Sequence, residues 1–208
     1  MRATSSVARR TTRAAAWVVA LACAGSSAAA QDTKVGVAIG AGVPATGIGL
    51  NNAGLALSGW LTRPIRGPYG WRVEAGSARL LMREDDRFRC AAVAIFCDAE
   101  IRISFVGGGL QIEPLADRAF APYAYAMIGL YHNSAAGEAT GAGAGSAQTS
   151  SAWSDNAFGI GLGSGLRIRL AERWALRFEL RYSGFGWEPG TVHWASLVTP
   201  TLATSVAF

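Results

Sequence analysis

The sequence predicts an all-β fold, an eight-stranded antiparallel up-and-down barrel. Three observations carry this prediction. Apolar residues alternate with small or charged ones in eight separate runs, no run has the period of an amphipathic helix, and the connections between runs alternate between short and long. Period-two alternation is typical of strands because successive side chains point to opposite faces. An even number of strands with short turns at one end and longer loops at the other is the layout of a closed barrel.

The clearest pair of strands lies between Phe158 and Ser183. In residues 158–170, Phe, Ile and Leu occupy one face, while glycine and arginine occupy the other. In residues 174–183, Trp, Leu, Phe and Tyr oppose Ala, Arg, Glu and Ser. Only residues 171–173 separate the two runs, so we expect a hairpin.

The other six strands have weaker but similar patterns. In the fourth, the alternation slips at Gly107-Gly108-Gly109, and a slip at glycines predicts a β-bulge. The six predicted strands are Lys34–Val43, Gly54–Thr62, Gly70–Leu81, Glu100–Glu113, Pro122–His132 and Ser196–Phe208.

The connections fall into two kinds. Short turns are expected at residues 64–68, 114–120 and 171–173. Longer, polar or glycine-rich loops are expected at residues 44–53, 82–98, 133–156 and 184–195. The segment 133–156 is rich in Gly, Ala, Ser and Thr, which predicts a solvated loop, and an adhesive role for it is one alternative.

Residues 1–30 have the three parts of a secretory signal peptide. Four arginines precede the apolar run Ala14–Ala24, which is shorter than the ~20 residues that cross a bilayer. We therefore expect cleavage after Ala30 and one barrel domain over residues 31–208. Without those four arginines, 19 Lys+Arg become 15 against 14 Asp+Glu, a net charge of +1, so nucleic acid is not an expected partner.

The two faces of the strands predict a barrel that spans a membrane. An eight-stranded barrel is just wide enough to be filled by its own side chains, so inward rows of Trp, Phe and Leu would overfill it. We expect these residues to contact lipid, where barrel closure satisfies every backbone group. A soluble, lipocalin-like periplasmic barrel is the alternative. The aromatic residues expected in girdles at the membrane interfaces are Trp60, Trp71, Tyr123, Tyr131, Trp174 and Tyr182.

The C-terminus adds a resemblance. Leu202, Val206 and Phe208 share one face, and the chain ends on the aromatic residue, which resembles the terminal signal of bacterial outer-membrane barrels. With the strand count, residues 31–208 resemble the small eight-stranded outer-membrane family of the OmpA barrel domain, OmpW and opacity-type porin-like proteins. The resemblance implies short periplasmic turns, long extracellular loops and an outer-membrane location. It also implies outer-membrane lipid, lipopolysaccharide and the barrel-assembly machinery as partners, with Phe208 as the assembly signal.

If the apolar face meets lipid, the opposite face carries charge into the lumen. Buried charges need partners, so an interior ion-pair network that plugs the barrel is one interpretation. A narrow, anion-leaning channel or ligand site is the other. The expected lumen residues are Lys34, Arg72, Glu74, Glu100, Arg102, Glu113, Arg167, Arg169, Arg177, Glu179 and Arg181.

Two further patterns concern a possible catalytic pair and a possible disulfide. His132-Asn133-Ser134 resembles the His-x-Ser pair of outer-membrane lipid A deacylases, in which the histidine acts as base for the serine and Glu138 would orient it. Cys90 and Cys97 are spaced to close a small disulfide loop in an exported protein, or they stay as two thiols. Neither pattern predicts a metal site or a cofactor, and a non-enzymatic structural or surface role is the main expectation.

Overall fold

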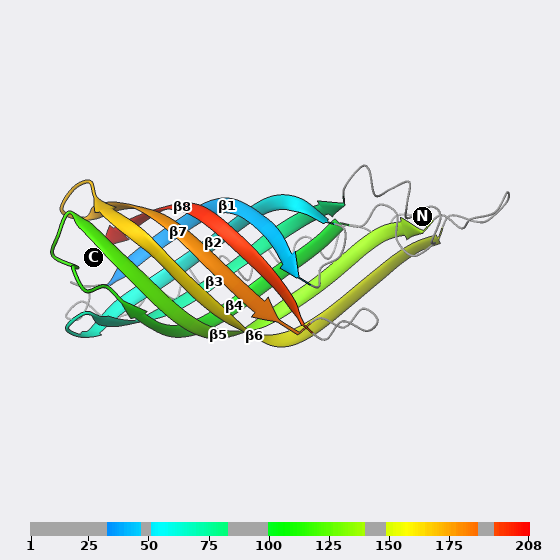
Figure 1. Ribbon diagram of the computed structural model, residues 1–208, viewed down its shortest axis with the longest axis horizontal. Helices are drawn as coiled ribbons and strands as arrows, with labels where there is room; N and C mark the ends of the chain where they lie inside the picture. Colours follow the sequence, from blue (N-terminus) through cyan, green and yellow to red (C-terminus); the bar gives the residue numbers. More distant parts are fainter. Residues whose placement is uncertain (1–32, 47–50, 83–99, 140–148, 187–193) are drawn as a thin grey trace.

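The computed structural model describes residues 33–46, 51–82, 100–139, 149–186 and 194–208, and these form a closed barrel (Figure 1). Each strand pairs antiparallel with its neighbours in the chain, and the first strand pairs with the last. The prediction of an eight-stranded antiparallel barrel is confirmed. The described residues contain no helix that is long and apolar enough to cross a membrane. The strands are β1 (Lys34–Thr46), β2 (Asn51–Arg66), β3 (Tyr69–Met82), β4 (Glu100–Ile112), β5 (Phe120–Ala139), β6 (Thr149–Arg169), β7 (Trp174–Phe185) and β8 (Ala195–Ala207).

The two ends of the barrel differ. One end, called the turn end below, carries the connections at 67–68, 113–119 and 170–173, together with the C-terminus (Figure 1). Gly67 has a φ of 57° there, in the left-handed region that glycine tolerates best. The opposite end, called the loop end below, carries the connections from β1 to β2, β3 to β4, β5 to β6 and β7 to β8. The predicted signal peptide and the Cys90–Cys97 pair lie outside the described residues.

Strand β4 has no bulge at Gly107–Gly109, contrary to the prediction. Its register with both β3 and β5 runs without a shift from Glu100 to Ile112. The apolar side chains change sides instead, because Ile101 and Ile103 are buried inside the barrel while Leu110 is 59% exposed outside. Three glycines between these two halves let the pattern change face without any displacement of the backbone.

Strands β5 and β6 are longer than predicted. They pair from Phe120–Ile168 to Ala139–Thr149, so most of the segment expected to be a loop at 133–156 is a two-stranded hairpin. Strand β7 pairs with β6 only between Gly159 and Arg169, and the hairpin projects beyond the other strands at the loop end (Figure 1). Small residues did not predict these strands because ladder hydrogen bonds come from the backbone, which needs no particular side chain.

The outer face of the barrel is apolar. Side chains such as Ile128 and Phe158 are 74% and 82% exposed, and many Val, Leu and Ile residues of the other strands also point outward. Exposed apolar surface on this scale marks a membrane or partner contact. Trp71, Trp174 and Tyr182 also lie on this face, as expected.

The interior is more apolar than predicted. At the loop end it is filled by a cluster of buried residues that includes Leu80, Ile103 and Phe185. The expectation that large apolar and aromatic side chains all face lipid is therefore wrong. Three of the residues expected in the girdles point inward and are buried instead, because glycines on neighbouring strands leave room for their rings; they are Trp60, Tyr123 and Tyr131.

Candidate functional site

A row of glycines on β6 makes space for the site. Tyr125 and Tyr123 of β5 pair across the ladder with Gly163 and Gly165, and their rings lie over these glycines. A Cβ atom added to Gly163 would lie only 2.2 Å from Tyr125 Cζ. Because β6 has no side chains at Gly163 and Gly165, both tyrosines point their hydroxyl groups into the barrel.

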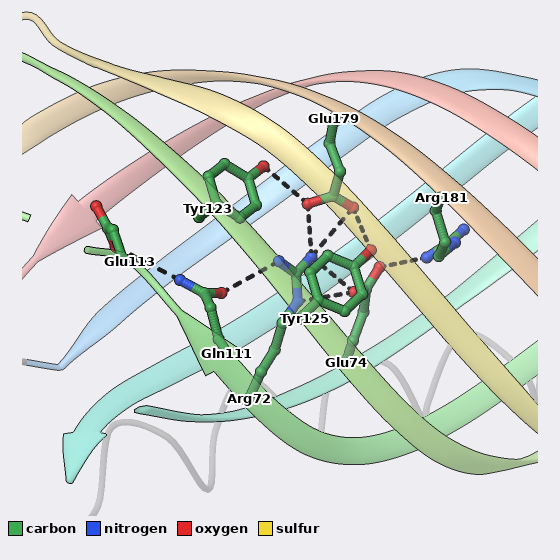
Figure 2. Close-up of polar contacts among 8 residues, drawn as sticks. All are labelled: Arg72, Glu74, Gln111, Glu113, Tyr123, Tyr125, Glu179 and Arg181. Carbon is green, nitrogen blue, oxygen red and sulfur yellow. Dashed lines mark hydrogen bonds and ion pairs between the residues drawn. The ribbon is translucent and has the colours of Figure 1, made fainter. Parts of the chain in front are cut away.

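Arg72 of β3 is at the centre of the site (Figure 2). Its Nη2 donates to Glu74 Oε2 at 2.7 Å and to Glu179 Oε2 at 3.0 Å. Arg181 of β7 donates to the other oxygen of Glu74. Strands β3 and β7 are four places apart in the closed order of eight strands, so they lie on opposite walls. These ion pairs therefore cross the lumen.

The tyrosine hydroxyls complete this network. Tyr125 donates to Glu179 Oε1 at 2.6 Å and Tyr123 donates to Glu179 Oε2 at 2.9 Å. The guanidinium carbon of Arg72 lies 3.9 Å from the Tyr125 ring centroid, which adds a cation–π contact. We call Arg72, Glu74, Tyr123, Tyr125, Glu179 and Arg181 the central network; its two arginines and two glutamates balance in charge and are all buried.

A second group of charges lies towards the turn end. Glu113 accepts a hydrogen bond from Lys34 Nζ at 3.2 Å and another from Arg167. Burial opposes ionisation of Glu113, but the positive charges of Lys34, Arg177 and Arg167 outweigh it and hold the pKa of this carboxyl below its usual range. Arg167 also donates to the carbonyl of Ala116 at 2.5 Å, which ties the turn to the barrel interior.

Arg177 differs from the other buried arginines. It is fully buried, and its guanidinium carbon lies 4.1 Å from the Trp60 ring centroid and 4.8 Å from that of Tyr123. None of its three nitrogens has a hydrogen-bond partner among the described residues. The contacts of Arg177 in this region are thus with aromatic rings.

Three of the expected lumen residues, Glu100, Arg102 and Arg169, lie elsewhere. Arg102 and Arg79 both pair with Glu100, at 3.3 and 2.5 Å, in an exposed cluster on the outer face near the loop end. Their placement follows from the change of face in β4, which turns its apolar residues inward at this end. Arg169 is exposed at the turn end and donates to the carbonyl of Ala116 at 2.8 Å. The other expected lumen residues point into the barrel.

The residues of the catalytic hypothesis do not meet as a base and a nucleophile. His132 Nδ1 lies 2.9 Å from Asn156 Oδ1, whereas Ser134 Oγ donates to the carbonyl of Arg102 at 3.5 Å. No hydrogen bond joins His132 to Ser134, and the side chain of Glu138 lies outside what the structure describes. The same described residues contain no group of three His, Cys, Asp or Glu side chains that could hold a metal ion.

The inward position of several aromatic residues was not predicted from the sequence. Tyr123 and Tyr125 alternate with alanines, so hydrophobicity alone did not show which face of β5 points inward. The signal lay in the next strand, where Gly163 and Gly165 form a surface on which large neighbouring side chains can pack. Trp60 was missed for the same reason, since it lies against Gly36 of β1.

Comparisons with known proteins agree with this architecture. Residues 16–193 match the family model described as "Outer membrane protein beta-barrel domain". Neisserial surface protein A is similar in structure, with a TM-score of 0.61 at 14% identity over 85% of this chain and 97% of that chain. The attachment invasion locus protein Ail of Yersinia pestis gives 0.53 at 13% identity, over 86% of this chain and 99% of its own.

A major outer membrane protein of Thermus thermophilus is also similar, with a TM-score of 0.51 at 17% identity over 85% of this chain and 99% of that one. At these identities the likeness concerns the fold alone. No curated protein matches the chain in sequence.

Proposed function

Because the chain belongs to the family of outer-membrane protein β-barrel domains, we propose that it is a non-enzymatic barrel with a closed interior, which acts through the surface at its loop end. The single observation that carries this proposal is the central network. A solute channel needs a continuous path along the axis, and here buried ion pairs join opposite walls.

The burial of the network supports a plug. Arg72 and Glu74 are each 1% exposed, and Arg181 is 3% exposed, so solvent does not reach the middle of the barrel. The apolar cluster around Leu80 and Ile103 fills the interior on the loop side of this level. A permeating ion would have to displace both layers, and breaking a buried pair costs about 3–5 kcal/mol.

The projecting hairpin of β5 and β6 supports a surface role. Short turns of outer-membrane barrels face the periplasm and long loops face outward, which assigns the hairpin to the cell surface. Outer-membrane lipid and lipopolysaccharide would then surround the apolar outer face, and the assembly machinery would recognise the last strand together with the terminal Phe208. In this proposal the barrel is an anchor and the hairpin is the contact element.

Planar-bilayer recordings test the closed interior. We expect no conductance steps from the purified, refolded protein across a range of salt and voltage. The double variant Arg72→Ala with Glu179→Ala removes one of the two ion pairs that join opposite walls and leaves the Arg181–Glu74 pair in place. It is expected to leak ions where the wild type does not. Steady, anion-selective steps from the wild type would refute the plug and favour a narrow channel.

Labelling of intact cells tests the assigned surface. In a background with Cys90→Ser and Cys97→Ser, a membrane-impermeant maleimide is expected to label Ala139→Cys on the hairpin without permeabilisation. Arg66→Cys at the turn end is the matched control and should react only after the outer membrane is permeabilised. The reverse pattern would overturn the orientation on which the surface role depends.

A further inference from the structure

The barrel interior contains hydrogen-bond donors that lack acceptors. Nine buried side-chain atoms have no partner among the described residues, and all but Asn133 Oδ1 are able to donate. Five of the nine belong to three residues: the three nitrogens of Arg177, Nε1 of Trp60 and the hydroxyl of Thr62. Arginine and the indole N–H act only as donors, so they cannot satisfy one another.

The strand register and one ring contact bring Arg177 against Trp60. Arg177 of β7 pairs with Ala203 of β8, which in turn pairs with Ala38 of β1. On the β8 and β1 side, the positions level with Arg177 thus carry only methyl side chains, whereas its register partner on β6 is Arg167. The guanidinium lies over the Trp60 ring on β2. Thr62 follows Trp60 by two residues and points to the same inner face.

The nearby carboxylates are already occupied. Glu113 accepts hydrogen bonds from Lys34 and Arg167, and Glu179 accepts them from Arg72 and two tyrosines. The described part of the lumen has five cationic side chains against three carboxylates, an excess of two positive charges. The cations are Lys34, Arg72, Arg167, Arg177 and Arg181, and the carboxylates are Glu74, Glu113 and Glu179.

A buried guanidinium without a hydrogen-bonded counter-charge is costly, because its desolvation is not repaid by hydrogen bonds. The two rings that lie against Arg177 contribute cation–π attraction, yet they accept none of its N–H groups in the way an anion does. A small anion supplies what Arg177 lacks, which is a negative charge within hydrogen-bond distance and several acceptors in a place closed to solvent.

We propose that the barrel binds one small inorganic anion of about the size of chloride between Arg177, Trp60 and Thr62. The Arg177 guanidinium supplies the charge and the main donors, the Trp60 indole N–H adds a directed donor, and the Thr62 hydroxyl adds another. The site lies between the central network and Glu113, so the anion also reduces the positive excess of the lumen. This proposal does not depend on the surface role proposed above.

Folding stability in chloride tests the site. The unfolding equilibrium of the refolded protein is measured in detergent micelles while sodium chloride replaces sodium gluconate at constant ionic strength. A ligand that binds only the folded state raises the folded-to-unfolded ratio tenfold for each tenfold rise in concentration above its dissociation constant. The wild type is expected to follow this relation, and Arg177→Met is expected to lose it.

Matched variants separate the site from general salt effects. Arg102→Met removes an exposed arginine on the outer face and should keep the chloride dependence of the wild type. If Arg177→Met does not fold, Trp60→Phe is used instead; it keeps a ring, loses Nε1, and should need more chloride for the same shift. A chloride dependence that both site variants retain in full would overturn the proposal.

Crystals grown in sodium bromide give a direct readout. Bromide replaces chloride in such sites and scatters anomalously, so we expect a peak within hydrogen-bond distance of the Arg177 guanidinium and Trp60 Nε1. An ordered water at this place, with no anomalous signal, would show that the donors bind solvent and would refute the anion site.

Discussion

Replacing Glu179 by glutamine removes a charge that several groups share. Its carboxylate accepts hydrogen bonds from Arg72 at 3.0 Å, from Tyr123 at 2.9 Å and from Tyr125 at 2.6 Å. Glutamine has the same shape, but its amide carries no charge and one of its two oxygens is replaced by a donor. The substitution therefore leaves the packing in place and breaks the charge balance of the central network.

The magnitude follows from what remains around Arg72. Removing one partner of a buried ion pair costs about 3–5 kcal/mol of folding free energy. Arg72 keeps Glu74 as a second carboxylate at 2.7 Å, so we expect the lower end of that range, about 3 kcal/mol. Glu100→Gln is the matched control, because Glu100 pairs with Arg79 and Arg102 on the exposed face, where such pairs contribute about 0–1 kcal/mol.

The assay is urea unfolding of the refolded protein in micelles, followed by tryptophan fluorescence and by the gel shift between boiled and unboiled samples. Glu179→Gln should lower the unfolding midpoint with little change in slope, and Glu100→Gln should leave the midpoint nearly unchanged. A loss below about 1 kcal/mol for Glu179→Gln, or equal losses for both variants, would show that the central network does not stabilise the barrel as described.

Other substitutions probe the glycine row, the second group of charges and the catalytic hypothesis. Gly163→Ala places a methyl group against the Tyr125 ring and should cost about 1–3 kcal/mol in the same unfolding assay, whereas Gly108→Ala, with no atom nearer than 3.7 Å, should be nearly neutral. Folding lowers the pKa of Glu113, so the stability that its charge contributes is fully present above an unfolded pKa of about 4.3. This contribution is lost as the pH falls through the folded pKa. Unfolding curves from neutral to acidic pH should therefore depend less on pH in Glu113→Gln than in the wild type. His132→Ala should leave lipid A acylation unchanged in mass spectra of the membrane fraction. A change in acylation would support the lipid A deacylase hypothesis.

The sequence predicted the barrel because its strands alternate strongly where one side meets lipid and the other meets small or charged residues. The run 174–183 shows this best, since Phe178 and Leu180 are exposed outside while Arg177 and Glu179 are buried inside. The same rule failed in β4, where the apolar residues move from the inner face to the outer face along one strand. A period-two pattern identifies the two faces of a strand but does not say which one the next stretch will bury.

The partners within the site could not be predicted in the same way. The pairing of Arg72 with Glu179 joins residues far apart in the chain, and it depends on closure of the barrel and on the register of every strand between them. The position of Tyr125 required knowledge that Gly163 lies opposite it. The sequence therefore showed which side chains were available, and the three-dimensional register decided which of them meet.

The ion pairs that cross the lumen also bear on how the barrel assembles. The bonds from Arg72 to Glu179 and from Arg181 to Glu74 form only after the sheet has curled far enough to bring β3 opposite β7. In a sheet that is still open within the bilayer, Glu179 and Arg181 would lack these partners and would face hydrocarbon or hold water there, at a cost of several kcal/mol per ion. Half-inserted intermediates are thereby disfavoured, and insertion and closure become coupled into one cooperative event.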